Sequence, residues 1–141
     1  MNWLVFALLA TVTYGFYNFF TKLSADKLSP AIALIFVGIA SFIVGLASIG
    51  FSKILGQPIL FSRNALLFPL LAGLFAGVAE IFYLTMFSKG APLSIGNPLV
   101  VGGTVIISAV LGLLLLKEPL NAIKIGGIAL TLIGLVILAR G

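Results

Sequence analysis

Five long apolar runs, separated by short polar breaks, constrain the fold of this chain more than any other feature. They cover residues 3–21, 30–51, 65–87, 92–116 and 122–139. A membrane-spanning helix needs about 20 mostly apolar residues, because the hydrocarbon core of a bilayer is about 30 Å thick and each helical residue rises about 1.5 Å. The pattern therefore predicts an all-α integral membrane protein with five transmembrane helices.

The composition excludes most other classes of protein. With 62% hydrophobic and only 8% charged residues, the chain has too little polar surface for a water-soluble domain. It contains no Cys and no His, so thiolate nucleophiles, imidazole bases and the usual zinc ligands are missing. The three acids, Asp26, Glu80 and Glu118, form no acid and base pair at a recognisable spacing. We therefore predict no enzyme activity, no cofactor and no metal.

The breaks between the runs, residues 22–29, 52–64, 88–91 and 117–121, are short. Consecutive helices should therefore pack antiparallel as one domain, residues 1–141. No basic residue precedes the first run and no small-residue cleavage pattern closes it, so we interpret it as a retained helix with Trp3 at the head groups. In the last break, Asn121 is a suitable cap for the final helix, and Glu118 would lie favourably near that helix N-terminus.

The basic residues are scattered singly, which argues against a nucleic-acid partner and for a bilayer. Five spans divide them equally between the two sides of the membrane, with Lys53, Arg63, Lys117 and Lys124 on the side of the N-terminus and Lys22, Lys27, Lys89 and Arg140 on the other. Because the positive-inside rule then gives almost no preference, we predict that the chain inserts in both orientations. The alternative is one orientation, set by hydrophobicity or by a partner.

Small residues at helical spacing mark surfaces where membrane helices approach closely. Every span after the first carries such a stripe: Gly38, Ser41, Gly45, Ser48 and Ser52 on the second, Ala72, Gly73, Ala76 and Gly77 on the third, Thr104, Ser108 and Gly112 on the fourth, and Gly127, Thr131 and Gly134 on the fifth. We predict that these stripes are helix contacts.

Glu80 is the only acid within a predicted span. An unpaired carboxylate in hydrocarbon costs at least a few kcal/mol, so Glu80 must face protein or water. It continues the face that carries Gly73 and Gly77, which points it into the bundle. It either binds a proton or a solute during function, or is a structural carboxyl that pairs with a hydroxyl of a neighbouring helix.

Two further spans carry polar side chains. On the first, Thr11, Tyr14, Asn18 and Thr21 share one face, with Tyr17 beside it; such a face either lines a cavity or joins helices. On the fourth, Pro98 cannot donate to the carbonyl of Ser94, so the helix should bend or loosen beside Asn97. Broken helices are common at transporter substrate sites, although a simple kink is an equal alternative.

The segment from Ser88 to Arg140 resembles the end of an EamA domain, the unit of the drug/metabolite transporter superfamily. The likeness rests on the order of a helix with a central proline, an acidic loop and a glycine-rich closing helix, here Pro98, Lys117, Glu118, Pro119, Gly126, Gly127 and Gly134. The first span also resembles the opening helix of the family, through Trp3, Tyr14, Gly15, Asn18 and Lys22. Most members carry two inverted five-helix halves, and this chain has one. The related small multidrug resistance proteins are four-helix antiparallel dimers, but their essential first-helix Glu is missing here, and Glu80 is not in an equivalent position.

The residues and the resemblance together predict a multi-pass protein of the plasma or inner membrane. Two copies inserted in opposite directions would form a ten-helix inverted-repeat bundle that transports a small organic solute by alternating access, with or without a coupled proton. The candidate substrate-binding residues are Tyr14, Tyr17, Asn18, Glu80 and Asn97. The alternatives are a heterodimer with a second five-helix chain, and a membrane subunit that transports nothing itself.

Overall fold

A computed structural model describes residues 3–119 and 121–140. Over these residues the secondary structure is helical throughout and contains no strand. The elements are α1 (Trp3–Ala25), α2 (Pro30–Ile54), the single 3-10 turn η1 (Arg63–Ala65), α3 (Leu67–Ser88), α4 (Leu93–Leu114) and α5 (Ala122–Arg140). Each of the five α helices is long and apolar enough to cross a membrane. The predicted all-α membrane fold with five spans is confirmed.

Most helix boundaries lie within three residues of the sequence prediction, and the largest difference is at the end of α1. Helix α1 continues past residue 21 to Ala25 and so includes Lys22. The Nζ of Lys22 finds a partner within the protein, because it donates a hydrogen bond to the carbonyl oxygen of Phe87 at 3.2 Å. Helix α4 ends at Leu114, two residues earlier than predicted. Both Leu115 and Leu116 then direct their N–H groups back to the carbonyl of Leu111, which closes the last turn.

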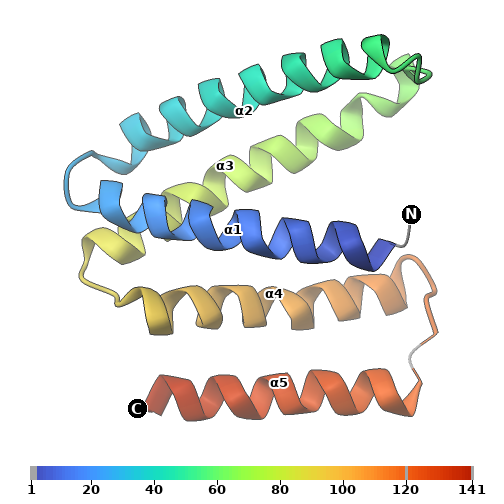
Figure 1. Cartoon of the computed structure of the whole chain (residues 1–141). Coiled ribbons are helices and arrows are strands. Elements are labelled where there is room, and N and C mark those ends of the chain that lie inside the picture. Colours follow the sequence, from blue (N-terminus) through green and yellow to red (C-terminus); the bar gives the residue numbers. More distant parts are fainter. Residues whose placement is uncertain (1–2, 120, 141) are drawn as a thin grey trace. The chain divides into compact units, whose positions relative to one another are not determined.

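The chain divides into two compact units, Met1–Lys89 and Gly90–Gly141. In the first unit, α1 and α3 run in the same direction, and α2, which connects them in the chain, runs in the opposite direction (Figure 1). The pairs that join α1 to α3, Asn18 with Tyr83 and Lys22 with Phe87, are both 65 residues apart, as expected for parallel neighbours in a constant register. The most deeply buried side chains, Leu84 and Phe87, lie in the last two turns of α3. The core of this unit is therefore at the C-terminal ends of α1 and α3.

In the second unit, α4 and α5 are antiparallel (Figure 1). Their closest approach is at Gly102, where an added Cβ would overlap the side chain of Leu135. Helix α4 continues through Pro98 without a break. Pro98 lies only in the second turn of the helix, where its ring removes a single backbone hydrogen bond and the flanking turns continue.

The loop between α4 and α5 agrees with one sequence prediction and corrects another. The Oδ1 of Asn121 accepts a hydrogen bond from the N–H of Lys124 at 2.8 Å, so the predicted N-cap is confirmed. Glu118, however, turns back onto α4: its N–H donates to the carbonyl of Gly112 at 3.0 Å, and its Oε2 would lie 3.2 Å from a Cβ added there. The positive φ of Lys117, 55°, allows this reversal.

The predicted small-residue stripes are mostly uncovered in the single chain. No described atom lies within 4 Å of a Cβ added at Gly38, Gly45, Gly73, Gly127 or Gly134. Gly77 meets only the end of Leu34, at 3.9 Å. The one buried residue of α2 among those described, Ala33, lies in its first turn, before the stripe begins at Gly38.

Candidate functional site

Polar side chains gather where α1 meets α3, and we call this group the polar seam: Tyr17, Asn18 and Thr21 on α1, with Glu80 and Tyr83 on α3. The spacing explains the grouping, because residues three and four apart lie on one helix face. Asn18 and Thr21 are only 9% and 5% exposed, while most large apolar side chains point outward. Polar groups inside and apolar groups outside is the arrangement that a bilayer favours.

Hydrogen bonds connect the two sides of the polar seam. The hydroxyl of Tyr83 donates to Oδ1 of Asn18 at 3.0 Å. The hydroxyl of Tyr17 lies within hydrogen-bonding range of the Glu80 carboxyl group and of the Thr21 hydroxyl. One carboxyl oxygen, Oε1 of Glu80, is buried and has no hydrogen-bond partner among the described residues. A buried acceptor without a donor costs free energy, and this oxygen is the one unsatisfied side-chain acceptor of the polar seam among the described residues.

Lys22 closes one end of the polar seam. Its Nζ donates to the carbonyl of Phe87, lies 5.5 Å from the centre of the Phe87 ring, and is 4.0 Å from Oδ2 of Asp26. A cation near the C-terminus of α3 is favourable to the helix dipole. The Phe87 ring in turn packs edge-on against Tyr83, with centroids 4.7 Å apart. Lys22 therefore holds the end of α1 against the end of α3.

The structure brings together three of the five predicted site residues, Tyr17, Asn18 and Glu80. Tyr14 is 65% exposed, and its ring meets Tyr17 edge-on at 6.1 Å between centroids. Asn97 lies on α4, in the second unit.

Two participants were not among the predicted site residues. Tyr83 had a signal in the sequence, because it follows Glu80 by three residues and so shares its face. Lys22 had none, because its partner is the backbone carbonyl of a residue 65 positions away.

A groove of about 290 Å³ between α1 and α2 adjoins the polar seam, and we call it the α1–α2 groove. Tyr17, Thr21 and Ser24 contribute polar groups to its wall, whereas Phe36 and Leu84 are among its apolar lining residues. Because Tyr17 and Thr21 belong to both features, the groove leads to the polar seam.

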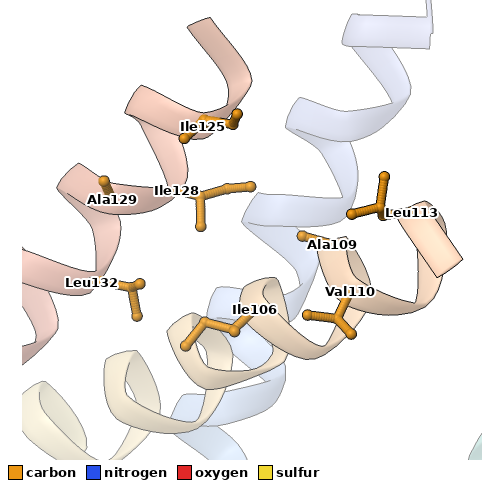
Figure 2. A pocket seen from close by; sticks show the side chains of 8 residues that line it. All are labelled: Ile106, Ala109, Val110, Leu113, Ile125, Ile128, Ala129 and Leu132. Carbon is orange, nitrogen blue, oxygen red and sulfur yellow. The ribbon is translucent and has the colours of Figure 1, made fainter. Parts of the chain in front are cut away.

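A second groove, about 280 Å³, lies between α4 and α5. Figure 2 shows its lining, which consists of aliphatic side chains from both helices, including Ile106, Ile128 and Leu132. Such a surface offers no group that could orient a polar solute. In the described part of the chain, moreover, no group of three or more His, Cys, Asp or Glu side chains could hold a metal ion.

Three comparisons with known proteins bear on the family of this chain. The sequence model of the EamA-like transporter family matches residues 1–140. Curated proteins and solved structures gave no significant match. The match covers nearly the whole sequence and supports membrane transport within the drug/metabolite superfamily as the coarse function. The chain belongs to the EamA-like transporter family.

Proposed function

We propose that this protein moves a small organic solute across the cell membrane by alternating access, with the polar seam as part of its substrate site. The observation that carries the proposal is a carboxylate, an amide and two phenols gathered between α1 and α3, within apolar spans. Small residues and single polar side chains are enough to join helices in lipid, whereas a cluster that includes a carboxylate is more typical of a functional site. Membership of a transporter family makes a solute the natural partner for them.

The proposed site contains Tyr17, Asn18 and Glu80 of the first unit, with Tyr14 at its edge. Asn97 on α4 stays a separate candidate for binding the solute in the second unit. Glu80 would exchange a proton for the solute in a coupled cycle, since an intramembrane acid is most often functional. In the alternative, Glu80 only stabilises the bundle through Tyr17, and the remaining groups form a neutral site.

Transport is tested by reconstituting the protein into vesicles, incubating them with a cell extract, and identifying accumulated solutes by mass spectrometry. At least one small solute should accumulate with the wild type and about tenfold less with Asn18→Leu, because this isosteric change removes the amide that pairs with Tyr83. Thr11→Val is the matched control: Thr11 is exposed on α1 and its hydroxyl donates to Ala7 of its own helix. No accumulation by correctly inserted wild type would favour the non-transporting subunit.

The proposed assembly is an antiparallel dimer in which two five-helix domains form an inverted-repeat bundle. The equal division of basic residues and the uncovered stripes of α2 and α5 support it. A heterodimer with a homologous five-helix chain would use the same surfaces.

Orientation distinguishes the homodimer from the heterodimer. The chain has no native cysteine, so Gln57→Cys places a single thiol in the loop after α2. An impermeant maleimide added to intact cells should label about half of the molecules, and three lysines added to this loop should make the labelling uniform. Labelling of all or none of the unmodified molecules would require a differently oriented partner chain.

A further inference from the structure

The most informative atom of the polar seam is Oε1 of Glu80, a buried hydrogen-bond acceptor that has no donor among the described residues. Resting on the proposed transport function, we infer that the solute is an organic cation with at least one N–H group, and that Oε1 of Glu80 accepts the hydrogen bond.

The Tyr17 hydroxyl lies within hydrogen-bonding range of the Glu80 carboxyl group, and other donors of the first unit are engaged elsewhere. The Tyr83 hydroxyl donates to Asn18, and the Ser24 hydroxyl donates to the carbonyl of Thr21 at 2.8 Å. Thr85, one turn beyond Glu80 on α3, donates to the carbonyl of Ile81. Oε1 is buried and none of the described residues donates to it, so a donor on a bound molecule would satisfy this acceptor.

The charge of the bound molecule follows from the lack of a countercharge. Lys22 is the one basic residue on the buried side of α1, and its ammonium is held by Phe87 and Asp26. Among the described residues, the only ion pair is Lys22 with Asp26, so Glu80 has no basic partner. A carboxylate in an apolar span is strongly stabilised by a cation and excludes an anion.

The shape and lining of the α1–α2 groove favour an organic cation over a metal ion. A metal ion of the calcium or magnesium type needs several oxygen ligands, and the described acids form no such cluster. The groove holds about 290 Å³ and presents the rings of Tyr17, Phe20 and Phe36. Aromatic rings bind the hydrocarbon body of an amine and attract its charge. Tyr17 connects this lining to Glu80.

Three probes of related shape separate charge from hydrogen-bond donation. Benzyldimethylammonium has a positive charge and one N–H, benzyltrimethylammonium has the charge without an N–H, and benzyl alcohol has a donor without charge. Their dissociation constants are measured by calorimetry on the full chain in lipid nanodiscs. We expect the wild type to bind benzyldimethylammonium about tenfold more tightly than either of the others, because only this probe combines a positive charge with a hydrogen-bond donor for the carboxylate.

Glu80→Gln should bind the three probes with similar affinities, while Thr11→Val should keep the wild-type preference. Equal binding of all three probes by the wild type overturns the inference, and this result does not depend on any variant folding. A preference that survives in Glu80→Gln also overturns it.

The vesicle experiment separates this inference from the proposed function. If the wild type transports a neutral solute and shows no probe preference, the cation inference fails and transport stands. If the probe preference is present and no solute is transported, the cation site stands and the transport proposal fails.

Discussion

The two units of this protein use their helix interfaces differently. Between α1 and α3 the contacts are polar, directional and buried, as in the hydrogen bond from Tyr83 to Asn18. Between α4 and α5 the close contact is Gly102 against Leu135, and the adjoining groove is wholly aliphatic. The comparison teaches that buried polar contacts and close aliphatic packing are separated between the two units of one short chain. Changes in the polar seam should therefore alter transport, and changes between α4 and α5 should alter stability.

The largest expected effect is on transport by Glu80→Gln. The amide keeps the shape of the side chain and one acceptor oxygen but cannot carry the negative charge, so a coupled exchange would stop. We expect solute uptake into vesicles to fall to the level of empty vesicles, and any pH dependence to disappear, while the variant still purifies as the wild type does. Normal uptake with an unchanged pH profile would show that Glu80 is structural, and the comparison would lose its main support.

The next effect concerns the packing of α4 against α5. Gly102→Leu places a large side chain where a Cβ already meets Leu135, so the helices must separate. We expect the free energy of unfolding in detergent, measured by urea titration followed by circular dichroism, to fall by about 1–3 kcal/mol. Gly127→Leu on α5 is the matched control and should change stability little in the isolated chain, because no described atom is near its Cβ position. Similar stabilities for the two variants would mean that the helices do not pack through Gly102.

Tyr83→Phe should have the smallest effect. It removes the hydroxyl that donates to Asn18 and leaves the ring that packs against Phe87. Because the buried amide oxygen loses this donor, we expect about 1 kcal/mol of destabilisation, measured by the same urea titration, and a several-fold loss of uptake. Thr13→Val on α1, whose hydroxyl donates only within its own helix in the described contacts, serves as the control. If Tyr83→Phe lowers stability and leaves uptake unchanged, the polar seam only joins α1 to α3. Both units would then use their helix interfaces for stability alone.

Much of the fold could be predicted because hydropathy acts locally. Each span is recognisable from about 20 apolar residues, and the N-cap of α5 from one asparagine. The end of α1 could not be predicted in the same way, because the fate of Lys22 depends on a carbonyl of α3. Glu118 was misplaced for the same reason: its backbone partner, Gly112, lies across a turn that depends on the left-handed conformation of Lys117.

The candidate site was partly visible in the sequence. Glu80 stands out as the lone acid in an apolar span, and Tyr17 and Asn18 as polar residues on a hydrophobic helix. These residues contact one another because α1 and α3 are parallel neighbours in one register. Helical periodicity shows which residues share a face of one helix, but not which helices are neighbours. Periodicity also predicted helix contacts at Gly38 and Gly45, but neither glycine is covered by another helix in the single chain. A stripe of small residues shows which face of a helix can pack closely, but it does not show which helix packs against it.

The sequence by itself determined that this protein is helical, spans a membrane five times and must shelter Glu80, because the cost of placing polar groups in hydrocarbon applies to each residue regardless of its neighbours. Only the tertiary structure decided that Tyr83 would pair with Asn18, that Lys22 would close the end of α3, and that Oε1 of Glu80 would be left without a donor. These are properties of pairs of helices, and a hydrogen bond depends on distance and direction between atoms that the chain brings together from far apart.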